Sequence, residues 1–126
     1  MPHLVLRGSL NPEAAAAGLE PRVVRWGRAV IKTGDRWRRT EPGAVLVEGV
    51  VVELARPLHP VALVAERDGD TVVRLWPLVE VERTAAVQRF LGLVAGRLQE
   101  LGCGAVRTTN IGGDALAGLD LVVDLE

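Results

Sequence analysis

One stretch of the sequence, residues 22–39, combines positive charge with aromatic rings. It holds seven basic side chains against one acidic side chain, Asp35, and two of the three tryptophans. Guanidinium groups neutralise phosphates and aromatic rings stack on bases, so this combination is typical of a nucleic-acid or partner-binding surface. The nine candidate residues are Arg22, Arg25, Trp26, Arg28, Lys32, Arg36, Trp37, Arg38 and Arg39.

The charge of the whole chain does not favour a nucleic-acid partner, because the usual footprint is a basic domain. Residues 1–40 carry eight basic and three acidic side chains, and residues 41–126 carry seven and thirteen. The two parts therefore have net charges of +5 and −6, which sum to −1. The alternative is that Trp26 and Trp37 belong to the core while the arginine heads are solvated or paired with the acidic part.

The sequence contains no local catalytic or metal-binding motif. His3 and His59 are the only histidines, and no Cys or His lies within ten residues of the single cysteine, Cys103. Zinc sites need three or four ligands at short spacings, and a reactive thiol needs a base beside it. We therefore expect no metal, no cofactor and no catalytic residue, and we interpret Cys103 as a small buried thiol.

The sequence predicts two helices, a further single helical turn over 114–117, and a series of strands. Asn11 caps a short helix over 12–17, and Thr84 caps a long helix over 85–101 whose apolar side chains recur at helical spacing. Strands are expected over 3–7, 36–40, 44–54, 61–66, 70–78, 104–107 and 119–125, with a turn at 41–43.

The segment from Pro21 to Thr33 fits two structures. Its basic residues share one side of a helical wheel, which favours an amphipathic helix. Its β-branched residues, Gly27 and the following Gly34-Asp35 favour strands. We expect an antiparallel hairpin centred on Gly34-Asp35, with Gly27 as a bulge or kink, and keep the helix as the alternative.

Together these elements predict a single α+β domain over residues 1–126. We expect a mostly antiparallel sheet of about five strands, with the helix over 85–101 packed on one face and the short N-terminal helix beside it. No apolar run approaches the ~20 residues of a membrane helix, and no export signal is visible. With one cysteine, the fold suits a reducing compartment, so a cytoplasmic location without membrane partners is expected.

The apolar strands exceed what one core can bury. Residues 44–47 and 50–52 are apolar without alternation, so both faces of the sheet require cover, while one long helix covers one face. A second copy of the chain would cover the other, and wrapping by residues 1–33 and the C-terminal segment is the alternative. The acidic exception, Glu48, is expected to pair with an arginine of a neighbouring strand or subunit.

Three functions follow from these observations. The first is a non-catalytic module that associates with itself, most simply as a homodimer, and with a further protein partner of unknown identity. The second is a nucleic-acid-binding accessory protein using residues 22–39. The third is a small-molecule binder or enzyme with an untypical site lined by Trp26, Trp37, Trp76 and Glu48.

Asp68-Gly69 is the clearest turn signal in the chain, because it separates two strand-like segments by two residues. This spacing pairs Arg67 with Asp70, Leu63 with Arg74 and Val61 with Trp76.

We predict that Gly69→Val destabilises the protein, because a β-branched side chain fits poorly at the positive φ that this turn requires. The measurement is the midpoint of thermal unfolding. A helix, or a loop of more than five residues, across Arg67 to Asp70 would contradict the pairing.

Overall fold

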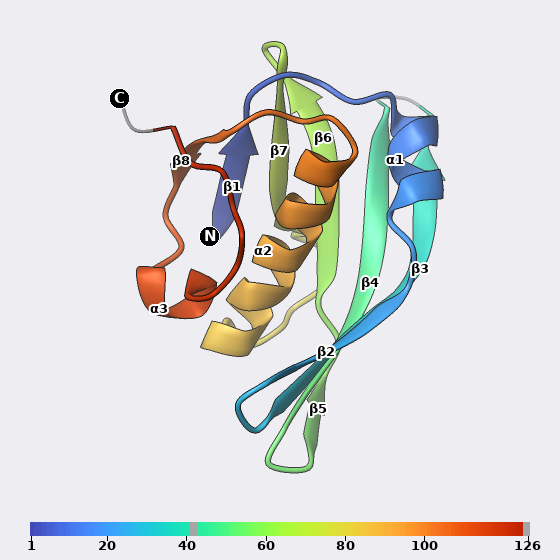
Figure 1. Ribbon diagram of the computed structural model, residues 1–126. Coiled ribbons are helices and arrows are strands. Elements are labelled where there is room, and N and C mark those ends of the chain that lie inside the picture. The colour runs from blue at the N-terminus through green and yellow to red at the C-terminus, as the bar shows by residue number, and fades with distance from the viewer. Residues whose placement is uncertain (41–42, 125–126) are drawn as a thin grey trace.

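A curled antiparallel sheet with its helices on one side forms the protein (Figure 1). The computed structural model describes residues 1–40 and 43–124, so most of the expected turn at 41–43 lies outside the described residues. The strands are β1 (His3–Leu6), β2 (Arg22–Trp26), β3 (Ala29–Arg39), β4 (Ala44–Glu53), β5 (Arg56–Leu58), β6 (Val61–Arg67), β7 (Asp70–Leu75) and β8 (Val106–Thr109). The helices are α1 (Pro12–Gly18), α2 (Ala85–Glu100) and α3 (Gly113–Leu116).

The strands are ordered β2-β3-β4-β6-β7-β1-β8, each antiparallel to its neighbour, and β5 pairs with β4 beside this path. The α+β class with a mostly antiparallel sheet is therefore confirmed. The predicted count of about five strands is wrong, because the described residues form eight, whereas the third helix, α3, matches the helical turn predicted over 114–117. The ambiguous segment before β4 supplies two strands, and the short β5 had no signal of its own.

The hairpin of β2 and β3 turns at a different glycine from the one predicted. Trp26 pairs with Ala29, and Gly27 has φ 56°, a value that glycine adopts without strain. Gly34 and Asp35 lie inside β3, where its register with β4 shifts between Thr33 and Arg36. The prediction of strands was right. The turn, however, lies at Gly27 and the irregularity at Gly34, which is the reverse of what was predicted.

The hairpin of β6 and β7 has the predicted two-residue turn. Asp68 and Gly69 have φ 52° and 83°, and Arg67 pairs with Asp70. Leu63 pairs with Arg74, also as predicted, although β7 ends at Leu75 rather than at residue 78. The amide of Trp76 still donates to the carbonyl of Val61.

The C-terminal segment does not form the strand predicted over 119–125, of which residue 125 lies outside the described residues. Only Val123 makes an isolated parallel bridge, to Val106. Leu119 and Leu121 instead lie against α2, beside Gly92 and Gly96. The apolar residues that suggested a strand therefore serve to cover the helix.

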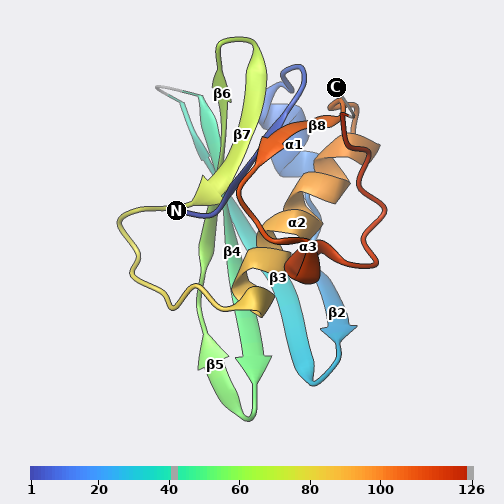
Figure 2. The same cartoon turned by 90° about the vertical axis from the view of Figure 1, so that its left-hand side faces the viewer.

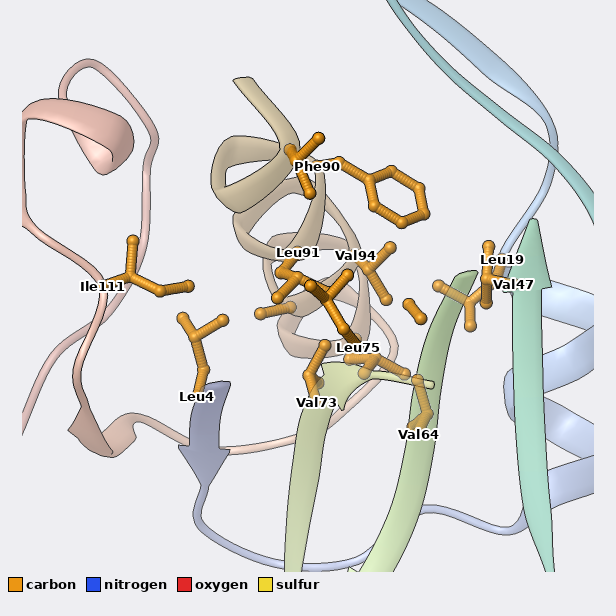
Figure 3. Packing of buried hydrophobic residues seen from close by; sticks show 14 of the residues in the cluster. Leu4, Leu19, Val47, Val64, Val73, Leu75, Phe90, Leu91, Val94 and Ile111 are labelled. Carbon is orange, nitrogen blue, oxygen red and sulfur yellow. The ribbon is translucent and has the colours of Figure 1, made fainter. Parts of the chain in front are cut away.

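Helix α2 covers the inner face of the sheet. The Thr84 hydroxyl accepts from the amide of Val87 and caps its start. In Figure 3 its Phe90, Leu91 and Val94 meet inward-pointing side chains of β1, β4, β6 and β7. At the closest approach, a Cβ on Gly49 of β4 would lie 2.6 Å from the Phe90 ring. Glycine is therefore needed in the middle of this strand.

We predict that Gly49→Ala destabilises the protein by about 1–3 kcal/mol, because the added methyl group displaces the buried Phe90 ring. The free energy of unfolding in urea measures this effect. Gly34→Ala on β3 is the matched control, since its Cβ would meet nothing closer than 3.6 Å. Equal stability of the two variants would contradict the close approach.

Candidate interaction surface

Strand alternation divides the basic segment 22–39 between the two faces of the sheet. Arg36 and Arg38 point to the helical side, where Arg36 Nε donates to the carbonyl of Ala16 and Arg38 lies 3.4 Å from the Glu13 carboxylate. Trp37 alternates with them on the other side and is 57% exposed. The nine candidate residues therefore do not form one surface.

The inward tryptophan of this segment belongs to the core of the protein. The guanidinium of Arg89, on α2, lies 4.6 Å from the centre of the Trp26 ring and donates to the carbonyls of Ala115 and Ala117. Burial lowers the pKa of Arg89, and its Nε has no hydrogen-bond partner among the described residues. Trp26 and Arg89 thus hold α3 and the β2–β3 hairpin against α2.

The basic residues at the start of the segment lie on or beside the edge strand β2. Arg22, Arg25, Arg28 and Lys32 are exposed. Exposed charges on an edge strand oppose the addition of a further strand. At the other edge, the amide of Val106 on β8 donates to the carbonyl of Val122.

The side of the sheet opposite α2, here called the outer face, bears no helix or strand of the described residues. Figure 2 shows α1, α2 and α3 together on the inner side. The wrapping alternative is therefore not observed, because α1 packs on β3 and β4 from the inner side and the C-terminal segment packs on α2. By alternation from the buried inner residues, the central outer-face side chains are Val5, Lys32, Leu46, Glu48, Val50, Val61, Leu63, Ala65, Val72 and Arg74.

A contact between Arg39 and Trp76 crosses this outer face. The guanidinium lies 5.7 Å from the ring centre, although β4 and β6 separate their strands in the sheet. The two long side chains reach toward each other across the face, and Leu63, on β6 between them, is only 5% exposed. Two open hollows remain on the face, of about 780 Å³ beside Val72 and about 450 Å³ beside Val50.

Three charged side chains lie in the middle of the outer face: Glu48, Arg74 and Lys32, which pairs in register with Val50. Glu48 pairs in register with Val61, and Arg74 pairs with Leu63. Glu48 is exposed and Arg74 is half-buried, and neither makes an ion pair among the described residues. The expected salt bridge of Glu48 to a neighbouring strand is therefore not formed, and the expectation of an arginine in a second subunit stays a prediction.

The remaining candidate groups lie apart from one another. His3 Nδ1 contacts the carbonyl of Met1, and His59 is exposed in a loop. Cys103 is buried, as expected. Burial raises the pKa of its thiol, and a hydrogen bond to Thr71 opposes that shift. No group of three metal-ligating side chains occurs in residues 1–40 and 43–124.

The site proposed for a small molecule is not assembled. Trp26 lies on the inner side of the sheet, whereas Trp37, Trp76 and Glu48 belong to the outer side. An apolar cavity does lie between β3 and α2, beside Leu19 and Val94, but its volume is about 50 Å³. Sites for drug-sized ligands are several times larger.

Comparison with family models, curated proteins and solved structures found no match for this chain. No helix within the described residues is long and apolar enough to cross a membrane. The surface therefore has to be interpreted from its own chemistry. The continuous basic segment 22–39 drew attention to Trp37 and Arg39, but nothing in it joined them to Leu63, Val72 and Arg74. The hairpin pairing already placed those three on one face.

Proposed function

We propose that the protein is a non-catalytic association module that binds a second copy of itself through the outer face. The observation that carries this proposal is a largely apolar sheet face without cover, on a chain whose three helices all lie on the opposite side. Apart from the buried Leu63, the valines and leucines at the centre of this face are half-buried by one another and by the Arg39–Trp76 contact, and a partner would remove them further from water.

The composition of the face supports a protein partner. Its centre is mostly aliphatic, Trp37 is exposed on it, and its charged side chains include Lys32, Arg39, Glu48 and Arg74. Aromatic residues and arginine are enriched in protein interfaces, and charged residues are depleted from their centres. A standard interface buries about 800 Å² of each partner. This is about a tenth of the 7120 Å² accessible surface of the chain.

The face is better suited to association than either edge of the sheet. Exposed arginines line β2, and the C-terminal segment is hydrogen-bonded to Val106, the first residue of β8. The ion pair between Arg7 and Asp124 fixes that segment beside β1. Face-to-face packing of two sheets buries the apolar surface and leaves these edges unchanged.

We predict that the chain has a mass of about 27 kDa in solution at micromolar concentration, twice the 13.5 kDa of one chain, by light scattering. Val72→Arg, at the centre of the outer face, should return it to the mass of one chain. Val122→Arg is the matched control, because Val122 is exposed away from that face. Circular dichroism verifies folding of both variants. A wild-type mass of one chain would contradict the proposal.

A nucleic-acid accessory function is the second candidate. The observation that favours it is the gathering of Trp37, Arg39, Arg74 and Trp76 on the outer face, since aromatic rings and arginines on a sheet bind single strands elsewhere. The aliphatic centre between them offers neither stacking nor phosphate contacts. This second function is therefore ranked below association.

We predict weak binding to generic single-stranded RNA or DNA at about 150 mM salt, because the net charge of the chain is −1. Fluorescence anisotropy with a labelled oligonucleotide measures it. Sub-micromolar binding that disappears in Trp37→Ala, but persists in the inward-facing Arg38→Ala, would promote this second function.

A further inference from the structure

Strand β2 forms one edge of the sheet, and no strand of the described residues pairs beyond it (Figure 2). Trp26 and Ala29 face each other across the two-residue turn, and such a turn is closed by a hydrogen-bonded pair. Hydrogen-bonded and non-hydrogen-bonded pairs alternate along an antiparallel ladder. The amides and carbonyls of Val23 and Arg25 therefore point away from β3, toward the free edge.

Positive charge surrounds this edge. The hairpin over residues 20–33 carries four basic side chains and one acidic side chain, Glu20, which gives it a net charge of +3. The four basic residues are exposed and have no ion-pair partner in residues 1–40 and 43–124; they are Arg22, Arg25, Arg28 and Lys32. The next acidic residue, Asp35, lies beyond the pairing of β2 with β3, which ends at Thr33. A strand added at this edge would meet an excess of unpaired positive charge.

The small apolar cavity between β3 and α2 extends to the same edge. Its lining includes Val24 of β2, Ile31 of β3 and Leu93 of α2, and its volume is about 50 Å³. The exposed Glu20 and Arg22 also line it, so the cavity opens beside β2. Val24 is half-exposed and faces the inner side of the sheet, because it pairs with the buried Ile31. In a strand added beside β2, the side chain next to Val24 would lie at the mouth of this cavity.

A second copy of this chain is poorly suited to supply that strand. Pairing β2 with β2 of another copy would bring the arginines of both chains together. The acidic C-terminal segment is held within its own chain, because the Gln99 side chain bonds the amide and the carbonyl of Val122, and Arg7 pairs with Asp124. The charge of the edge thus favours an acidic segment of a different protein.

We propose that the free edge of β2 binds an extended acidic segment of a partner protein, which joins the sheet as a further strand. Backbone hydrogen bonds to Val23 and Arg25 hold it, which is the general mode of β-strand addition. Its outward carboxylates lie beside Arg25 and Lys32, and an inward aliphatic side chain lies beside Val24. The segment therefore alternates acidic and aliphatic residues. The same arginines that oppose a strand of like charge attract this one.

A labelled peptide that alternates glutamate with valine tests the proposal by fluorescence anisotropy. It should bind the full chain saturably, and Arg25→Glu should weaken binding roughly tenfold or more, because carboxylates then face a carboxylate. The matched control is Arg67→Glu, because Arg67 is exposed on β6 and β3 and β4 lie between β6 and β2. This variant should bind like the wild type. The same peptide with lysine in place of glutamate should not bind, and melting curves verify that both variants fold.

Hydrogen exchange on the wild-type chain separates strand addition from attraction between charges alone. Bound peptide should slow the exchange of the amides of Val23 and Arg25, which face the free edge, and leave that of Arg67 unchanged. A peptide whose central valine is replaced by proline lacks one backbone donor and should bind more weakly.

Four results would overturn the proposal. The first is no saturable binding of the glutamate peptide at protein concentrations up to about 1 mM. The second is equal binding of the glutamate and lysine peptides, or full binding by Arg25→Glu, because the charge of β2 would then not select the partner. The third is unchanged exchange at Val23 and Arg25 with peptide bound. The fourth is a single-stranded oligonucleotide that binds more tightly than the peptide and is lost in Arg25→Glu, which would assign the edge to nucleic acid.

This site goes beyond self-association through the outer face and is tested separately from it. The Val72→Arg variant, designed to disrupt the outer face, should bind the glutamate peptide as tightly as the wild type. A chain that has the mass of one copy in solution but binds the peptide would overturn the proposed self-association alone. A dimer that binds no peptide would overturn the edge site alone.

Discussion

The contact of Phe90 with Gly49 fixes how the two layers of this protein meet. Because β4 has a glycine at that position, the ring enters the space of a missing side chain and α2 lies close to the sheet. Strand alternation then determines the neighbouring residue. With Gly49 directed at the helix, Glu48 must face the opposite side. The adjacent residues Glu48 and Gly49 of β4 therefore determine both how closely α2 packs on the sheet and where the negative charge lies on the outer face.

The three helices of the described residues all pack on the inner face of the sheet. The outer face is left without a helix. Helix α1 packs between α2 and β3, and α3 with the segment after it covers the exposed side of α2. Both additions enlarge the inner layer. This arrangement stabilises one core well, and it leaves the aliphatic residues of β4, β6 and β7 on the other side with cover only from each other and from the Arg39–Trp76 contact.

Short-range signals in the sequence were sufficient for part of this fold. Asp68-Gly69 specified a hairpin and its register, because a two-residue turn leaves one pairing. The exchange between Gly27 and Gly34 was not predictable in this way, since both sites suit a turn and the choice depends on how far β3 can pair with β4. The C-terminal apolar residues were misassigned because packing on a helix and pairing in a sheet require similar side chains.

The outer face was predictable only in outline. The excess of apolar strand surface indicated an uncovered face, but joining Trp37 to Arg74 required the strand order, which leaves only β4 and β6 between β3 and β7. The segment 22–39 looked like one surface because it is continuous in sequence. In a strand, continuity in sequence distributes neighbouring side chains to opposite faces.

The arginines of β2 and the closed edge at β8 have a consequence for the size of any particle this protein builds. Assembly through sheet edges has no natural end, because each added chain presents a fresh edge to the next, and fibres grow in this way. Assembly through a single face ends at two copies, since the pairing consumes the only surface that drives it. The proposed association through the outer face would therefore give closed particles rather than fibres, since one edge carries exposed charge and the C-terminal segment is hydrogen-bonded to Val106 at the other.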